Sequence, residues 1–523
     1  MIDSVTNGVA RLFGAASSTS WIYIATYAIA FLAVASPIIA FPVPVLFDYP
    51  AHLARQLIIH DLVTQGDFSV MYQLNLVVTP NLGMEAIVLP LLFLGVPVEI
   101  AGRIFLVLIV ALLGSGTASL HRALFGKTSF FPLFCFVFIF NPVFMFGFAN
   151  YMLGIALTLH AFAWWLHARR RPALGIVPVA LLWAVVLFFC HLMAVAFFLG
   201  LVFSYEASLA LIEWHSGERS SAFRQAMMVL AIPILAVAFL YHLTPLSAAP
   251  QTIDVHTIDD ILRRIPVRLK ALPRYLTAYS LPVDAAVLMV LTGLVGLALW
   301  FQRLRLCWPM LTPILGLLIL HLLVPDKWAG TEYLAYRIPI AVLFLCFSSV
   351  DIAWDRQFLP AITAAGMIGL RVGAALSAWA QANAQYQPIL QAMTRLPRHA
   401  AIYTGLNYRD DFEPLVRMPW SHLEAYAAIR NRLFVKGIWA YPTQNWIVHT
   451  PRYSKLGNLR LRNNRVDRDT TPGDNSDMFD PAHLAAYDFL IAVQPALYQR
   501  PIPAGVSLIA RSGKAALFSL HGR

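Results

Sequence analysis

A chain of 523 residues that is 59% hydrophobic and only 12% charged is too apolar for a soluble protein, whose charged fraction is roughly twice as large. Apolar runs of about 18 residues or more predict membrane-crossing helices, and the lack of ten-residue alternation argues against a barrel. In such a protein a formal net charge of +11 points to basic cytoplasmic loops and anionic lipid, and away from nucleic acid as a partner.

Apolar runs divide the first 379 residues into predicted membrane spans. Residues 1–20 form a short cytoplasmic lead. The apolar segment 84–94 has too few residues to cross a bilayer comfortably, so we expect it to be re-entrant or interfacial. The remaining runs predict an all-α polytopic bundle of about 11 transmembrane helices, at 21–43, 98–119, 130–147, 150–167, 173–190, 192–212, 226–243, 283–301, 307–324, 337–353 and 358–379.

Basic residues orient these spans, because cytoplasmic loops carry an excess of Lys and Arg. With the N-terminus inside, the three consecutive arginines at 169–171 lie in an inside loop. Counting 84–94 as a full crossing would place them outside, against this rule. The sequence therefore predicts a multi-pass protein of the bacterial inner (plasma) membrane whose C-terminal domain is extracytoplasmic.

Two outer loops are prominent in this topology. The first, 44–97, follows the first span directly. The second, 244–282, has apolar residues at helical spacing interleaved with basic residues between 254 and 279. This pattern predicts a basic amphipathic helix that lies on the outer leaflet and is broken at Pro266 and Pro273.

Residues 380–523 have the composition of a soluble domain. Segments 400–404, 488–493, 506–510 and 515–520 are expected to be strands, and 419–434 a helix, with a polar loop at 452–482. These elements predict a small α/β domain. Within it, Ser421 and His422 are interpreted as a helix cap, with Glu424 completing a capping box.

The segment 47–55, FDYPAHLAR, contains the strongest candidate site. Asp48 stands where the chain leaves the first span, and a carboxylate there is costly unless it is paired or faces a watery cavity. A helix starting at Pro50 would stack His52 and Arg55 on one face near Asp48. Two compatible interpretations remain: Asp48 is a helix N-cap, or it is a catalytic group.

The chain resembles the GT-C superfamily of membrane glycosyltransferases, which use polyprenyl-phosphate-linked sugars. In that superfamily the first outside loop carries an essential acidic residue, and here the segment 47–52, FDYPAH, is similar in position and type. The multi-span core and the outside C-terminal domain are similar too. This sequence departs from the pattern in having Tyr49 where an acidic pair is common, and its tail has no sugar-binding signature of the oligosaccharyltransferase type.

The resemblance implies transfer of a sugar from a polyprenyl-phosphate donor, with membrane lipids as surroundings and a glycan, lipid or protein as acceptor. Asp48 and His52 are then the catalytic candidates, because the acceptor must lose a proton. Cations would hold the departing phosphate. His191 is either a donor-site residue or a hydrogen-bonded core histidine, and snorkelling is the alternative for Arg337. The donor-binding candidates are Arg55, His191, Lys327, Arg337 and Arg371.

Two other functions stay open from the sequence. A transporter or flippase of a lipid-linked substrate would place polar groups near the bilayer midplane, with paired broken helices. A non-catalytic cell-envelope scaffold would use its tail to bind a partner. No Cys or His spacing indicates a metal site, and no cofactor is indicated. A divalent cation that assists the phosphate is an open alternative, with Asp61 and Asp67 the nearest further carboxylates to Asp48 in sequence.

Overall fold

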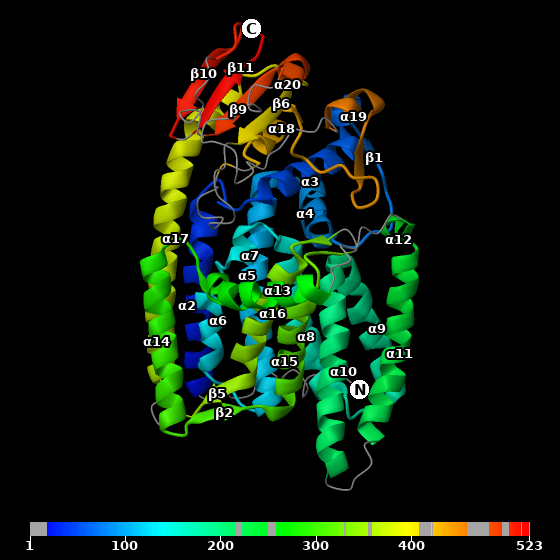
Figure 1. Ribbon diagram of the computed structural model, residues 1–523, viewed down its shortest axis with the longest axis vertical. Helices are drawn as coiled ribbons and strands as arrows, with labels where there is room; N and C mark the ends of the chain where they lie inside the picture. Colours follow the sequence, from blue (N-terminus) through cyan, green and yellow to red (C-terminus); the bar gives the residue numbers. More distant parts are fainter. Residues whose placement is uncertain are drawn as a thin grey trace, which may run out of the picture.

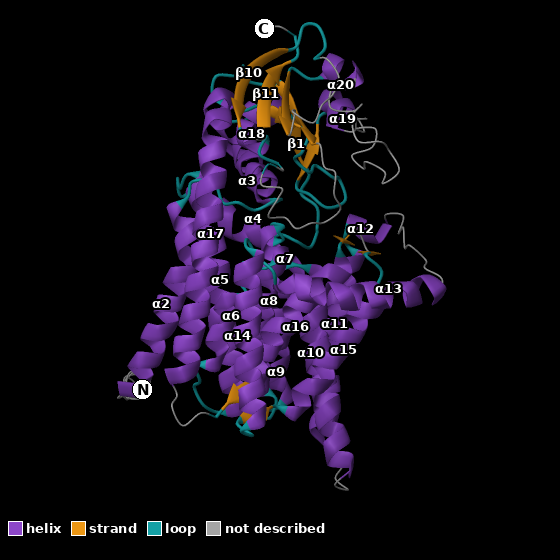
Figure 2. Cartoon of the chain, turned by 60° about the vertical axis from the view of Figure 1, so that its left-hand side comes forward, coloured by secondary structure: helices purple, strands orange, loops and turns teal. Residues whose placement is uncertain are grey.

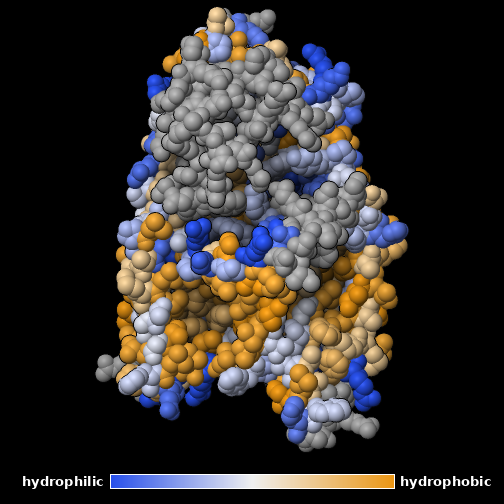
Figure 3. Space-filling model, in the orientation of Figure 1, coloured by the Kyte–Doolittle hydropathy of each residue, from blue (hydrophilic) through white to orange (hydrophobic). Residues whose placement is uncertain are grey.

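The computed structural model describes residues 18–215, 221–248, 258–328, 331–353, 358–406, 420, 422–457, 481–493, 502–513 and 515–521. It is a long helix bundle with a small α/β domain at one end (Figure 1). On the face shown in Figure 3, apolar residues cover the middle of the bundle and hydrophilic residues gather above and below them. The predicted class, a polytopic helical membrane protein with a C-terminal α/β domain, is confirmed. The predicted lead 1–20 and the centre of the polar loop 452–482 lie mostly outside the described residues.

Ten helices of the described residues run along the bundle (Figure 1). Within the described residues, seven helices are long and apolar enough to cross a membrane by length and composition. The main pairings join α5 to α8, α9 to α11, α15 to α16 and α2 to α17. These helices are α2 (Ser18–Ala40), α5 (Val98–Phe125), α8 (Ala149–Ala168), α9 (Ala173–Cys190), α10 (Leu192–His215), α11 (Ser221–His242), α14 (Leu281–Trp300), α15 (Leu311–Leu323), α16 (Leu334–Ser349) and α17 (Phe358–Met393).

The predicted span 130–147 is not one helix. It divides into η2 (Phe131–Leu133), α6 (Phe134–Val137) and α7 (Pro142–Met145). Asn141 is extended, with φ −88° and ψ 164°, and its side chain accepts hydrogen bonds from two amides of the next turn. Because Pro142 can start a helix but cannot continue one without losing a hydrogen bond, the chain breaks here.

Short helices lie at the end of the bundle that carries the α/β domain. They are α3 (Tyr49–Thr64), η1 (Asp67–Val70), α4 (Gly83–Phe93), α12 (Pro245–Ala248), α13 (Ile258–Ala271) and η3 (Leu272–Leu276). Helix α13 crosses the bundle at a steep angle to the long helices (Figures 1 and 2). The expected break at Pro266 is wrong, since α13 continues through it. Arg268 of α13 donates to three carbonyls at the end of α15, where the helix leaves its carbonyls without partners.

The C-terminal domain is built on a five-stranded sheet in the order β10-β11-β9-β6-β7. The four predicted strands are confirmed, while the predicted helix 419–434 is shortened to α18 (Ala425–Asn431). Strands β6 and β9 are parallel, and β9, β11 and β10 are antiparallel. The elements of the domain are β6 (Ala401–Leu406), β7 (Phe434–Val435), β8 (Ile447–His449), α19 (Pro451–Gly457), α20 (Pro481–Ala486), β9 (Phe489–Val493), β10 (Ser507–Ser512) and β11 (Ala515–Ser519).

Two connections fix this domain on the bundle. Helix α17 continues past residue 379 to Met393 and leads directly into the domain (Figure 2). In addition, β1 (Tyr72–Leu74) of the first loop pairs with β8 in an antiparallel ladder. Two further strand pairs lie elsewhere, β2 (Leu304–Leu306) with β5 (Val350–Ile352) and β3 (Lys327–Trp328) with β4 (Thr331–Glu332). The first loop and the C-terminal domain therefore form one continuous structure above the bundle.

Candidate active site

A cavity of about 670 Å³ lies between the end of the bundle and the C-terminal domain. One wall comes from the start of α3, the start of α8 and the first turn of α16. The opposite wall comes from residues 439–445 of the C-terminal domain, together with His422. The cavity lining includes the charged, polar and aromatic side chains of Asp48, His52, Arg55, Asn150, His191, Arg337, His422 and Trp439.

Asp48 is held in this cavity by backbone pairing. The amides of Phe47 and Asp48 donate to the carbonyls of Met145 and Phe146, at 2.9 and 3.0 Å. Gly147 follows with φ +83°, and a Cβ there would lie 2.8 Å from the Asp48 amide nitrogen. Only glycine fits this close, left-handed position. The broken segment that ends in α7 therefore positions Asp48.

The environment of Asp48 separates the two interpretations of this residue. Asp48 is the N-cap of α3 by position, but its carboxylate makes no capping hydrogen bond. The side chain is buried, and burial raises the pKa of Asp48 to about 7, against the opposing effects of His422 and Arg337. A carboxyl group with a pKa near neutrality can take up a proton in the physiological range. The geometry favours a chemical role over a capping role.

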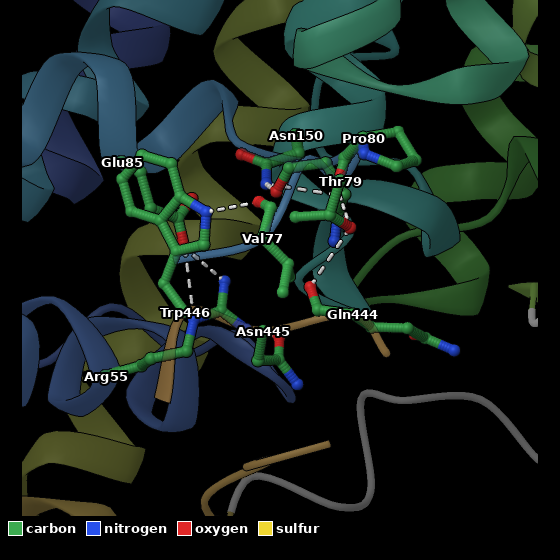
Figure 4. Close-up of polar contacts among 10 residues, drawn as sticks. Arg55, Val77, Thr79, Pro80, Glu85, Asn150, Gln444, Asn445 and Trp446 are labelled. Carbon is green, nitrogen blue, oxygen red and sulfur yellow. Dashed lines mark hydrogen bonds and ion pairs between the residues drawn. The ribbon is translucent and has the colours of Figure 1, made fainter. Parts of the chain in front are cut away.

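The two residues predicted to stack beside Asp48 differ in character. Arg55 is buried and bonds Glu85 Oε1 at 2.6 Å through Nη2 and Asn445 Oδ1 at 2.8 Å through Nη1 (Figure 4). His52 has a buried Nδ1 without a hydrogen-bond partner, and its ring lies 4.9 Å from that of Trp439. Burial first, and then the nearby Arg55, His422 and Arg337, hold the pKa of His52 well below its usual range. His52 is therefore a neutral imidazole, and the charge of Arg55 is compensated.

Arg337 lines the same cavity as Asp48, and no carboxylate of the described residues forms an ion pair with it. It is buried in the first turn of α16 and lies 4.0 Å over the ring of Phe148. Its Nη1 is 2.9 Å from Nε2 of His191, and its Nε has no partner. Among the described residues, none of the carboxylates lies within ion-pair distance of Arg337. The Arg337 side chain does not extend into solvent but is buried against the cavity.

The remaining predicted donor-binding residues differ in their position relative to the cavity. Arg371 does not line the cavity: it forms an ion pair of 2.9 Å with Asp284 of α14 and donates to the carbonyl of Leu276. This placement favours a structural role. Lys327 belongs to β3, and its side chain is outside the described residues. His191 does line the cavity, where its Nδ1 accepts a hydrogen bond from the amide of Met193.

No sequence pattern indicates the cavity wall that the C-terminal domain supplies. His422 Nε2 lies 3.6 Å from Asp48 Oδ1, and its Nδ1 lies 3.7 Å from Glu424 Oε1. Ser421 of the predicted capping box lies outside the described residues. Glu424 itself stands at the N-cap position of α18, where its side chain makes no capping hydrogen bond, and it accepts from Thr404 at 2.7 Å. These residues are far from Asp48 in sequence and carry no motif. Only the pairing of the first loop with this domain brings them together.

Hydrogen bonds join the first loop to the C-terminal domain (Figure 4). Trp446 donates to the carbonyl of Val77 at 3.0 Å, and Thr79 donates to that of Gln444 at 3.3 Å. Asn150 of α8 ties the first loop to the bundle by donating to the backbone carbonyl of Asn81 at 2.7 Å, and its buried Oδ1 has no hydrogen-bond partner. The cavity therefore has fixed walls on both sides.

The structure offers no metal centre in the described residues, where no group of three or more His, Cys, Asp or Glu side chains could hold an ion. The two carboxylates considered from the sequence are engaged elsewhere. Asp61 accepts from the amide of Phe68 at 2.9 Å, and Asp67 pairs with Arg398 at 2.6 Å. Neither lines the cavity with Asp48.

The chain is similar to ArnT from Cupriavidus metallidurans bound to undecaprenyl phosphate, with a TM-score of 0.52 and 13% identity over 97% of this chain and 100% of that one. It is also similar to the arabinofuranosyltransferase AftD from Mycobacteria, with a TM-score of 0.42 and 13% identity over 97% of this chain and 40% of that one. No protein-family model and no curated protein matches the sequence. The chain therefore shares the overall fold of ArnT over nearly its whole length.

Proposed function

We propose that the protein is a membrane glycosyltransferase that moves a sugar from a polyprenyl-phosphate donor to an extracytoplasmic acceptor. The observation that carries the proposal is the cavity lined by both a buried carboxylate, Asp48, and a buried cation, Arg337, that has no carboxylate of the described residues within ion-pair distance. The fold shared with ArnT, which was solved with undecaprenyl phosphate, supports a lipid-phosphate donor.

The two charges fit the two ends of the reaction. Asp48 takes the proton of the acceptor hydroxyl as that oxygen forms its bond to the anomeric carbon. The bond from the anomeric carbon to the donor phosphate breaks, and the polyprenyl phosphate leaves as an anion. Arg337 stabilises this anion, because a guanidinium makes charge-assisted hydrogen bonds to phosphate oxygens. His52, neutral and unpartnered at Nδ1, is a polar contact for a substrate hydroxyl.

The location of the cavity fits this substrate. It lies at the end of the bundle, beside the C-terminal domain and away from the bundle's middle. We place this end outside the cytoplasm of a bacterial inner membrane, on the charge bias of the loops. A donor whose lipid lies in the bilayer and whose phosphate lies at the surface would reach Arg337 from the bundle side. The transporter and scaffold alternatives have no comparable observation in their favour.

The test is a transfer assay with purified protein in lipid nanodiscs, using synthetic polyprenyl-phosphate sugars and the membrane extract as acceptor source. We expect at least one of these donors to lose its sugar to the acceptor and to release polyprenyl phosphate. We expect no sugar transfer from the matching polyprenol glycoside, which lacks the phosphate. Mass spectrometry of lipid-linked glycans from cells with and without the protein would identify the natural donor. Failure to bind or consume any polyprenyl-phosphate sugar would contradict the proposal.

A further inference from the structure

His422 is the one described residue of the C-terminal domain whose side chain lies at ion-pair distance from Asp48. Its backbone has φ 56°, in the left-handed region that is uncommon for residues other than glycine. Such backbone strain persists where the surrounding structure holds it, and it is concentrated at functional sites. The chain thus adopts an unfavourable conformation at the residue that points into the cavity.

Aromatic rings fix the imidazole in this position. The ring of His422 lies 5.0 Å from that of Trp439 and 5.6 Å from that of Phe47, both in edge-on geometry. Trp439 also contacts the ring of His52. These contacts come from the C-terminal domain and from the first loop, so both parts of the molecule position the ring.

A carboxylate supports the far side of the imidazole. Glu424 Oε1 lies 3.7 Å from His422 Nδ1, and Glu424 Oε2 accepts from Thr404 of β6. Gly437 leaves room for this arrangement, because a Cβ there would lie 2.3 Å from Glu424 Oε1 and 2.9 Å from His422 Nδ1. The order of groups is therefore Thr404, Glu424, His422 and Asp48, running from the sheet into the cavity.

We propose that His422 is a positioning residue for Asp48: the C-terminal domain supplies an imidazolium, supported by Glu424, that orients the cavity carboxylate and favours its ionised form. This inference rests on the proposed function, since it assigns the partner of the proposed base. It makes the soluble domain part of the active site. The distances of 3.6 and 3.7 Å are ion-pair distances, and catalytic contacts of this length in a protein without substrate commonly tighten in the substrate complex.

The charges around the pair are consistent with this role. Burial alone would lower the pKa of His422, but Glu424 and Asp48 outweigh it and raise that pKa above its usual value. The facing groups are Arg337 from α16 and His52 and Arg55 from α3. Without His422, Arg337 alone would oppose the effect of burial on Asp48.

The test compares His422→Gln with His399→Gln. His399 belongs to the same domain and has a similar left-handed φ of 64°, but it does not line the cavity. A hydrophobic carbodiimide reacts with protonated buried carboxyl groups, so peptide mapping of the labelled protein gives the pH midpoint of Asp48 without any turnover. We expect this midpoint, and the acid limb of the pH–rate profile, to move up by about one pH unit or more in His422→Gln and to stay unchanged in His399→Gln.

Two further variants test the support from Glu424. Glu424→Gln removes its charge, and Gly437→Ala displaces its carboxylate without changing any ionisable group. Both should move the Asp48 midpoint in the same direction as His422→Gln, by a smaller amount. An unchanged midpoint in a folded His422→Gln protein would overturn the inference, whether or not the wild type transfers sugar. A shifted midpoint in a protein that uses no polyprenyl-phosphate sugar would support the ion pair and overturn only the proposed function.

Discussion

Two buried arginines, Arg337 at the cavity and Arg371 between α14 and α17, are surrounded very differently. Arg371 has a carboxylate partner, Asp284, at 2.9 Å. Arg337 has an aromatic face and an imidazole as its neighbours, and no carboxylate within ion-pair distance among the described residues. A buried charge is costly unless it is paired. The difference indicates that Arg371 completes a structural pair, whereas Arg337 is available for the negative charge of a ligand.

Buried acidic groups show the same difference: Asp48 at the cavity is less closely paired than most carboxylates elsewhere. Asp48 has its nearest basic group, His422, at 3.6 Å. Three carboxylates buried away from the cavity have a closer basic partner. These closer pairs are Lys127 with Asp351 at 2.5 Å, Arg169 with Glu206 at 2.6 Å and Arg371 with Asp284 at 2.9 Å. A fourth, Asp61, has Arg432 at 3.8 Å but also accepts a hydrogen bond from the amide of Phe68.

The largest effect is expected from Asp48→Asn. Asparagine keeps the size of the side chain but cannot act as a base. Turnover should fall by about 10²- to 10⁴-fold, the usual contribution of such a group, while the melting temperature changes little. The measurement is a purified-enzyme transfer assay beside a melting curve. Full activity in the folded variant would end the assignment of Asp48 as the base.

Arg371→Gln should destabilise the folded protein, because it removes one partner of the buried pair with Asp284. Removing one partner of a buried ion pair leaves Asp284 uncompensated, so the protein should lose about 3–5 kcal/mol of stability. Donor binding by the folded fraction should be unchanged. Thermal unfolding of Arg371→Gln, and of the double variant with Asp284→Asn, measures this. The double variant should recover part of the loss, and a loss of donor binding without any loss of stability would reverse the roles of the two arginines.

Arg337→Gln should weaken ligand binding and leave stability nearly unchanged, the reverse of Arg371→Gln. One charge-assisted contact contributes about 1.5–3 kcal/mol, so binding of polyprenyl phosphate should weaken by about 10- to 100-fold. Stability should be little changed, because no ion pair is lost. Native mass spectrometry of lipid binding measures the effect. Arg398→Gln is the matched control, since it removes the same charge from a side chain that is 57% exposed.

The smallest effect is a pH dependence. The pKa of Asp48 is raised to about 7, mainly by burial, and a base must be ionised to work. Activity should therefore fall tenfold for each pH unit below that value and level off above it. The measurement is kcat/KM against pH for the free enzyme. A profile that stays flat down to pH 5 would place the base elsewhere.

Much of the fold could be predicted from local sequence patterns. Alternating and apolar segments marked the strands of the C-terminal domain, and Asp48 was found because it follows an apolar run directly. The break before Pro142 was missed, because a run of apolar residues conceals a change of backbone direction. Arg337 and Arg371 could not be distinguished, since the partner that neutralises Arg371 comes from another helix. His422 was missed for the same reason: its role depends on a contact between distant parts of the chain.

The continuity of α17 has a consequence for how this protein can vary in length. The helix runs for 36 residues, and Asn383 within it bonds both the amide and the carbonyl of Val43, close to Asp48 in sequence. An α-helix turns by about 100° and rises about 1.5 Å with every residue. One inserted residue between Asn383 and Met393 would therefore rotate the whole sheet by more than a quarter turn and carry His422 away from the cavity. Loops at the far side of the sheet can lengthen freely, whereas this helix tolerates insertions and deletions only in multiples that restore its angular phase.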